Sequence, residues 1–162
     1  MKINIKLDSN AVMPTRAHDN DAGMDLYAPE DFTVPRTKAV LLRDPGLVMG
    51  FNPMDALDIE VGSAAIDTGV HVEIPAGYAG MIKSKSGLNV NKGLTAEGVI
   101  DSGYTGSICV KLYNHTSRDV NFKRGDKITQ LVIMPCLLPE LNQVDRLEDT
   151  DRGDNGFGST GK

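Results

Sequence analysis

The sequence predicts an all-β domain, a sandwich or barrel built from many short strands, and three observations support this class. The chain has 162 residues, which is the usual length of one domain. Its 17 glycines and eight prolines are many for a helical protein and are typical of a chain rich in turns. Short apolar or alternating runs recur between these turn residues, as they do in sandwiches and barrels.

The first strand is predicted at residues 2–7, where polar and apolar residues alternate. This alternation is that of a strand and not of a signal peptide. A short helix is predicted to begin at Ser86, which we interpret as its N-cap because serine caps helices well. Further strands are predicted at 32–34, 38–42, 65–74, 78–83, 107–113 and 119–122, with one ending at Ile100 and a strongly apolar one after Gly125-Asp126.

Composition narrows the classes of partner. The net charge of −5 argues against broad binding to nucleic acid or to a membrane surface, because both need a basic footprint. No apolar run is long enough to span a membrane, and we expect a cytoplasmic protein. Cys109 and Cys136 lie in apolar runs, so we predict buried free thiols and no disulfide. None of the three histidines has a neighbour at metal-ligand spacing.

The most informative segment is Gly98–Gly106, in which two β-forming residues are followed by Asp101, a Ser-Gly turn and Tyr104. This order predicts a strand that ends at Ile100 and a hairpin tip at Ser102-Gly103. A carboxylate fixed at a strand end can orient a water molecule and take its proton. On these residues alone, an Asx turn at Asp101 is the commoner interpretation.

Four more segments carry polar residues among glycines, and each has an ordinary interpretation when taken alone. In chain order, the four segments fit a solvated acidic loop, a helix cap, a core strand after a polar turn, and a disordered terminus. The segments are Asp21–Ala28, Ser84–Leu88, Gly125–Leu131 and Arg152–Gly161.

Together with Gly98–Gly106, these segments resemble the five motifs of the trimeric dUTPase family, in the family's order. The resemblance implies a jelly-roll-like fold, a homotrimer with shared active sites, and hydrolysis of dUTP to dUMP and pyrophosphate with Mg²⁺. It divides the chain into a β domain at 1–144 and a flexible arm at 145–162 that closes over the site. The enzyme would keep uracil out of DNA and supply dUMP for dTMP synthesis.

The resemblance also assigns roles by residue. Asp101 would activate the attacking water, and Asp25 would hold Mg²⁺ through water. Main-chain groups between Leu94 and Ile100 would recognise uracil, and Tyr104 would pack on the deoxyribose. Lys85 stands where the family usually has arginine, so the charge is kept but the bidentate fork is not. The predicted substrate-binding residues are Lys85, Ser86, Gly87, Ile100, Tyr104, Gln130, Arg152, Phe157, Gly158, Ser159 and Thr160.

Two features leave alternatives open. An insertion at about 44–64 interrupts the family pattern, and it could serve as a lid, a trimer contact or a flap that binds a protein partner. A regulatory protein that keeps the nucleotide pocket is therefore one alternative function. Glu97 lies shortly before Asp101, and a dCTP deaminase of the same fold would need such an acid–base residue beside the base.

Overall fold

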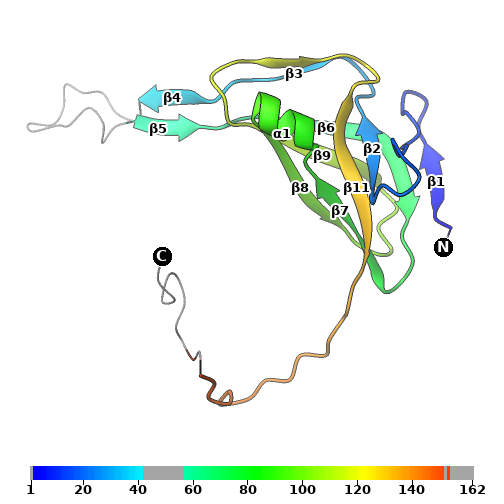
Figure 1. Ribbon diagram of the computed structural model, residues 1–162, viewed down its shortest axis with the longest axis vertical. Coiled ribbons are helices and arrows are strands. Elements are labelled where there is room, and N and C mark those ends of the chain that lie inside the picture. Colours follow the sequence, from blue (N-terminus) through cyan, green and yellow to red (C-terminus); the bar gives the residue numbers. More distant parts are fainter. Residues whose placement is uncertain (1, 42–56, 152, 154–162) are drawn as a thin grey trace, which may run out of the picture.

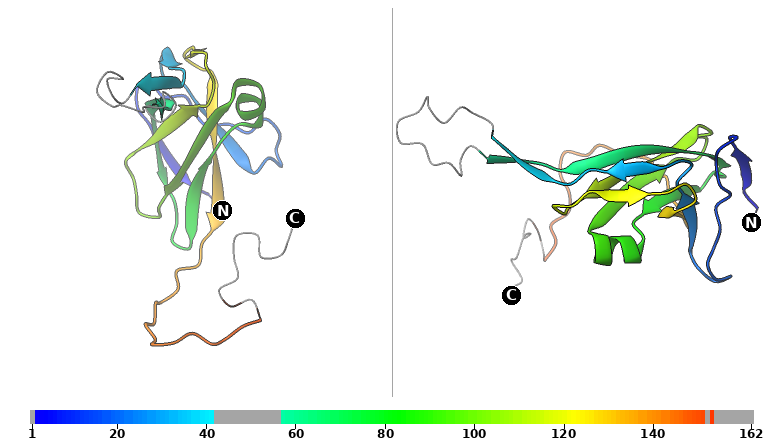
Figure 2. Two further views of the ribbon diagram at one scale, coloured as in Figure 1. Left: turned by 90° about the vertical axis from the view of Figure 1, so that its left-hand side faces the viewer. Right: turned by 90° about the horizontal axis from the view of Figure 1, so that it is seen from above.

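The computed structural model describes residues 2–41, 57–151 and 153, and it confirms an all-β architecture. Figure 1 shows a strongly curled antiparallel sheet with two small strand pairs beside it and one short helix. Figure 2 shows the same body from two other sides, with β4 and β5 projecting from it and the tail after β11 leaving it.

The large sheet contains seven strands, and every pair in it is antiparallel. In order across the sheet they are β1 (Asn4–Leu7), β6 (Gly62–Glu73), β9 (Ser107–Asn114), β8 (Leu94–Ile100), β7 (Tyr78–Lys83), β11 (Lys127–Pro135) and β2 (Gly23–Tyr27). The small pairs are β3 (Phe32–Val34) with β10 (Val120–Phe122), and β4 (Lys38–Leu41) with β5 (Leu57–Glu60).

Strand β8 is shared between two neighbours. Its first part pairs with β9, from Leu94 opposite Asn114 to Ala96 opposite Leu112. Its second part pairs with β7, from Glu97 opposite Lys83 to Ile100 opposite Gly80. Among the described strands, one side of the β8 backbone from Glu97 to Ile100 therefore has no partner, although the sheet continues on the other side.

The core is formed by the inward-facing side chains of these strands, because alternate residues of a strand point to the same face. In β9, for example, Ile108, Val110 and Leu112 are buried and alternate with more exposed residues. Leu26, Val34, Leu94, Ile128 and Leu131 from other strands join the same cluster. These alternating side chains therefore form the inside of the domain.

Three sequence predictions need correction. Cys109 and Cys136 are free, as predicted, but both are exposed, because Cys109 occupies an outward position of β9 and Cys136 follows the end of β11. The helix α1 spans Ser86–Lys92, so Ser86 is its first residue and not its cap. The N-cap is Lys85, which has extended backbone and makes no side-chain capping bond.

The predicted insertion is partly regular structure. Its last residues lie in β5 and at the start of β6, and β5 pairs with β4 as an antiparallel ribbon. The segment 44–56 lies outside the described residues, so its role as a lid, a trimer contact or a partner site stays a prediction.

The chain after β11 leaves the sheet as an extended tail (Figure 1). Its apolar side chains are exposed to solvent in this single chain: Leu137, Leu138, Leu141, Val144 and Leu147. Among the described residues, no helix has the length and apolar character needed to cross a membrane.

Candidate active site

The register of three neighbouring strands brings residues from three separate motifs together. Asp25 on β2 lies opposite Gln130 on β11, and Gln130 lies opposite Lys83 at the end of β7. The chain continues from Lys83 directly into Ser84 and Lys85. Residues far apart in the sequence therefore converge because antiparallel pairing places them side by side.

Asp25 is the charged centre of this group. It is only 5% exposed, and its two carboxylate oxygens contact different lysines. Oδ1 contacts the Lys85 ammonium, and Oδ2 lies 2.7 Å from the Lys127 Nζ. Burial by itself raises the pKa of Asp25, but the hydrogen bonds and charges of Lys127 and Lys85 outweigh burial and hold this pKa below its usual value.

Two positive charges therefore share one negative charge, and Asp25 and Lys85 line a cavity of about 400 Å³. Asp21, Gly23, Asp25, Lys85 and Gln130 are among the residues that line this cavity. The contact with Asp25 also raises the pKa of Lys127, so this ammonium stays charged. The cavity carries fixed cations beside polar groups, which suits an anionic ligand such as a phosphate.

Gln130 is fixed beside these charges. Its amide nitrogen donates a hydrogen bond of 3.0 Å to the Ser84 carbonyl oxygen. Its side chain passes over Gly23, where a Cβ atom would collide with the Gln130 amide oxygen. Glycine at position 23 therefore leaves room for Gln130 to lie in the cavity.

Ser86 and Gly87 open helix α1 next to Lys85. The first N–H groups of a helix have no partner within the helix, and they favour an anion. A Cβ atom at Gly87 would meet no other atom within 4 Å, so the space beside the Gly87 backbone is open. Asp25, Lys85 and Gln130 therefore line one cavity, and Ser86 and Gly87 follow Lys85 directly in the sequence. That all five bind the substrate stays a prediction.

Asp101 lies in a second group, immediately after β8. A turn follows it, with the Tyr104 N–H donating to the Asp101 carbonyl oxygen at 3.2 Å and with Gly103 at a φ of 87°. The Asp101 side chain is exposed, and it makes no hydrogen bond or ion pair with any residue that the structure describes. This carboxylate is therefore held at its backbone and available to a water molecule.

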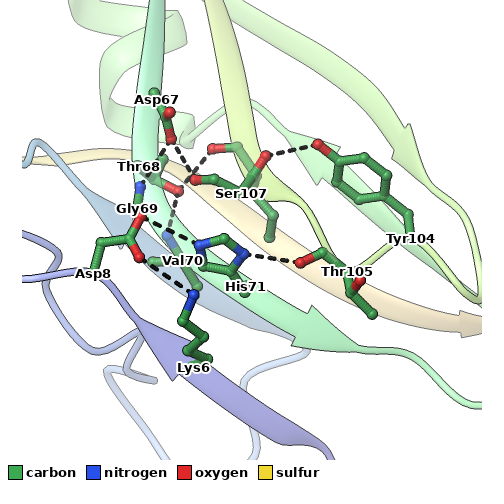
Figure 3. Close-up of polar contacts among 11 residues, drawn as sticks. Lys6, Asp8, Asp67, Thr68, Gly69, Val70, His71, Tyr104, Thr105 and Ser107 are labelled. Atoms are coloured by element: carbon green, nitrogen blue, oxygen red, sulfur yellow. Dashed lines mark hydrogen bonds and ion pairs between the residues drawn. The ribbon is translucent and has the colours of Figure 1, made fainter.

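Tyr104 lies in the same turn, 47% exposed. Its hydroxyl donates a hydrogen bond of 2.9 Å to the Ser107 carbonyl oxygen, which fixes the ring (Figure 3). A Cβ atom at Gly106 would lie 2.5 Å from the Tyr104 hydroxyl oxygen, so Gly106 is needed for this ring position. Ile100, at the end of β8, completes this second group beside the backbone side that lacks a partner among the described strands.

The two groups lie far apart within one chain. Gly80 on β7 lies opposite Ile100 at the end of β8, and Asp101 follows Ile100 directly. Lys85 lies five residues after Gly80, toward the opposite end of the strand pair. At about 3.3 Å per strand residue, the two positions are on the order of 20 Å apart. One chain therefore places the exposed Asp101 carboxylate and the cavity lined by Asp25 and Lys85 at opposite ends of the β7–β8 pair.

Glu97 does not resemble an acid–base residue of a buried base pocket. Its carboxylate accepts a hydrogen bond of 2.6 Å from Lys83, and its side chain is largely exposed. This hydrogen bond and the Lys83 charge lower the pKa of Glu97, so it stays ionised and is a poor proton donor near neutral pH. The geometry therefore disfavours the deaminase alternative.

Several predicted residues lie outside the described residues: Arg152, Phe157, Gly158, Ser159 and Thr160. Conversely, the structure adds Lys127, to which sequence reasoning gave no role. Lys127 lies in the Gly125–Leu131 motif, but only the pairing of β11 with β2 reveals that it reaches Asp25.

The fit to a magnesium ion follows from the oxygen donors of the cavity. No group of three or more His, Cys, Asp or Glu side chains in the described part of the chain could hold a metal by itself. Both Asp25 oxygens already contact lysines, so Asp25 suits a contact through water better than a direct bond. This donor set fits Mg²⁺, which keeps several waters and is often bound together with substrate phosphates.

Comparisons with known proteins point to one family. The dUTPase family model matches residues 56–161. A deoxyuridine 5'-triphosphate nucleotidohydrolase of Gloeothece citriformis is 36% identical, with 99% of this chain and 97% of the relative covered. The dUTPase of Staphylococcus bacteriophage 80alpha, solved with dUPNHPP, has a TM-score of 0.78 and 28% identity, with 99% of each chain covered. A mutant of the dUTPase from phage phi11 of S. aureus has a TM-score of 0.70 and 26% identity, covering 92% of this chain and all of that one, and coordinates a structural Mg(II) ion.

Proposed function

The chain belongs to the dUTPase family and is a deoxyuridine triphosphate nucleotidohydrolase, and from this premise we propose that Asp101 is its general base. The observation that carries the proposal is the exposed Asp101 carboxylate, which is held at the end of β8 by a turn and has no partner among the described residues. An ionised carboxylate in this setting accepts a proton from a water molecule.

The reaction is an in-line displacement at the α-phosphorus of dUTP. The Asp101 carboxylate takes a proton from water as the water oxygen bonds to the α-phosphorus. The bond from this phosphorus to the oxygen that bridges to the β-phosphorus breaks, and pyrophosphate leaves with dUMP as the other product. Positioning and charge stabilisation carry most of the catalysis in such reactions.

We assign the phosphates to the cavity around Asp25. Lys85 and Lys127 supply positive charge there, and Ser86 and Gly87 begin helix α1 directly after Lys85. The Gln130 side chain points to the same place. From the arm, we propose that Arg152, Ser159 and Thr160 contact phosphates and that Phe157 and Gly158 close over the nucleotide. The pairing of Asp25 with two lysines supports a cavity that has ammonium groups available to phosphates.

Base recognition is proposed for the side of β8 that lacks a partner among the described strands. Main-chain N–H and C=O groups near Ile100 are available there to pair with the edge of uracil. A cytosine in this place would leave a polar group unpaired, at a cost of about 1–3 kcal/mol. The fixed ring of Tyr104 provides a flat face for the deoxyribose.

Magnesium is proposed as the cofactor. It would be held by the triphosphate and, through water, by Asp25. When bound, it neutralises phosphate charge and orients the triphosphate. The dUTPase of phage phi11 coordinates a structural Mg(II) ion, which supports magnesium binding in this family but does not bear on its place in the site.

The distance between the two groups of residues supports a shared site in a homotrimer. Neither Asp101 nor Lys85 has a side chain that spans the roughly 20 Å between them, so a complete site needs a second copy of the chain. The exposed apolar residues of the tail, from Leu137 to Leu147, support the same proposal, because such a segment gains stability only when another surface covers it.

Mixing two inactive variants tests the shared site. Asp101→Asn and Lys85→Ala should each be nearly inactive alone. If Asp101 and Lys85 of one site come from different copies, a random mixed assembly holds intact residues in about a quarter of its sites. Co-expression in equal amounts should therefore restore about a quarter of the wild-type turnover. Activity that stays at the level of the separate variants would place both residues of a site in the same chain.

The function itself is tested by pyrophosphate release with Mg²⁺ from dUTP, dCTP, dTTP and UTP in parallel, with ammonia measured in the dCTP reaction. We expect release from dUTP only. Ammonia from dCTP would instead indicate a deaminase, and Glu97 would then be the first residue to mutate. No release from any nucleotide would favour the regulatory alternative. The expected activity serves to keep uracil out of DNA and to supply dUMP for dTMP synthesis.

A further inference from the structure

We propose that His71 is a positioning residue of this active site, and that its doubly protonated imidazole ties the turn of Asp101 and Tyr104 to the loop after β1. The inference rests on the proposed role of Asp101. Figure 3 shows the imidazole between Asp8 on one side and the Thr105 carbonyl on the other.

Both partners of the imidazole can only accept hydrogen bonds. The His71 Nδ1 lies 2.8 Å from the Thr105 carbonyl oxygen, and the His71 Nε2 lies 3.2 Å from the Asp8 Oδ2. A neutral imidazole has one N–H group, so it can donate to only one of these oxygens. Both contacts are satisfied at once only when both ring nitrogens carry a proton. The geometry therefore selects the charged form.

A bulge in β6 directs His71 to this place. The pairing of β6 with β9 shifts between Asp67 and His71, and Gly69 in between has a φ of 66°. The bulge is fixed inside by Thr68, which is fully buried and donates from its hydroxyl to the Ile108 carbonyl at 2.8 Å. It is fixed outside by the Asp8 N–H, which donates to the Gly69 carbonyl at 2.9 Å. Position 71 is therefore set by the fold and not by the imidazole itself.

The far end of the turn has its own attachments. The Ser107 hydroxyl donates to the Asp67 carboxylate, and the Tyr104 hydroxyl donates to the Ser107 carbonyl (Figure 3). These contacts are made by two hydroxyl groups, a carboxylate and a backbone carbonyl, and they contain no histidine. Thr105 lies in the chain between Tyr104 and Ser107, and its carbonyl oxygen contacts His71. The position of this part of the turn therefore depends on His71. When His71 loses one proton, the charged Asp8 carboxylate is the stronger acceptor for the N–H that remains, so the proton stays on Nε2 and the hydrogen bond to Thr105 is lost. This loss would loosen the turn without releasing the strand.

The charges around His71 favour its protonated form. The Thr105 carbonyl and then the Asp8 carboxylate raise the pKa of His71 above its ordinary value of 6.5, while Lys6 on β1 opposes them. Asp67 and Glu73 on β6 add negative charge to this part of the fold, and Asp67 is close enough for its pKa to be lowered by His71. Because the folded-state pKa is raised, the imidazolium contacts are complete at low pH and are lost as the pH rises through that raised value.

Three variants test the proposal through the pH dependence of kcat/KM for dUTP. His71→Gln removes the titrating group. Asp8→Asn offers an amide N–H to Nε2, so that a neutral imidazole can donate from Nδ1 to Thr105 and accept from that amide. His115→Gln is the matched control, because His115 contacts Thr95 near the other end of β8. The pKa of His71 is measured in parallel by NMR, together with the amide-exchange protection of residues 102–106.

The wild type should lose about three- to tenfold in kcat/KM on the alkaline side, the effect of one hydrogen bond on the turn. The midpoint should coincide with the NMR pKa of His71, and the protection of 102–106 should fall with it. The control His115→Gln should keep this pH profile. Asp8→Asn should keep its kcat/KM at pH values above the midpoint. His71→Gln should have a low kcat/KM at every pH and no alkaline loss. An unchanged alkaline loss in His71→Gln or Asp8→Asn, or a pKa of His71 at or below 6.5, would overturn the proposal.

The same measurements separate this proposal from that of Asp101. Asp101→Asn removes the proposed base but leaves Asp8, His71 and Thr105 in place. An active Asp101→Asn variant would reject the general base, whereas the titration of His71 and the protection of the turn would still report on the imidazole. If the amide-exchange protection of residues 102–106 did not change as His71 titrates, the positioning role would be rejected even in an active enzyme.

Discussion

Asp101→Asn should bind the nucleotide as the wild type does and turn dUTP over about 10²- to 10⁴-fold more slowly. The amide has the size of the carboxylate but accepts no proton from water. Because the side chain is exposed and makes no hydrogen bond with any described residue, the change should leave the fold intact. The measurement is pyrophosphate release from dUTP, together with calorimetric binding of the non-hydrolysable analogue dUPNHPP.

A matched control is Asp119→Asn. Asp119 is also exposed, and its Oδ1 accepts a hydrogen bond from the Arg36 N–H, a contact that the amide oxygen of asparagine can keep. This variant should retain wild-type turnover. If Asp101→Asn were slowed no more than Asp119→Asn, another group would have to take the proton.

A chain that stops after Asp151 should fold and assemble but lose at least about 10² of its turnover. The removed segment contains Arg152, Phe157, Ser159 and Thr160, to which we assign phosphate and base contacts. The core and the strands that carry Asp101 and Lys85 all precede it. Turnover, thermal unfolding and sedimentation of the truncated chain are the measurements.

Arg152→Ala in the full chain distinguishes the charge of the arm from its length. If the guanidinium carries the effect, this single change should reproduce most of the loss, whereas Lys162→Ala at the end of the same segment should not. A truncated chain with wild-type turnover would show that the arm has no part in the reaction.

The strands were largely predictable, for a physical reason. Apolar alternation marks strands locally, and turn residues such as Ser102-Gly103 mark where they end. Each motif taken alone had an ordinary interpretation, so the roles predicted for Asp101, Lys85 and Gln130 depend on the resemblance of all five motifs together to the dUTPase family. The prediction that Asp101 follows a strand is confirmed by the end of β8 at Ile100.

What depends on pairing between distant strands was not predictable. Lys127 reaches Asp25 only because of the register of β11 against β2, which no local pattern encodes. His71 meets Thr105 only because β6 bulges at Gly69. The burial of Cys109 was predicted wrongly because an apolar run does not tell which of its residues point inward when strands alternate.

The sharing of β8 between two neighbours has a consequence for how this enzyme can evolve. The same few residues expose the backbone that we assign to base recognition and end in the residue that we assign to catalysis. Inserting or deleting one residue in β8 would reverse the facing of every following side chain and move both features at once. A substitution of an outward side chain such as Val99 leaves this register unchanged, whereas a shift of register would alter base recognition and catalysis together.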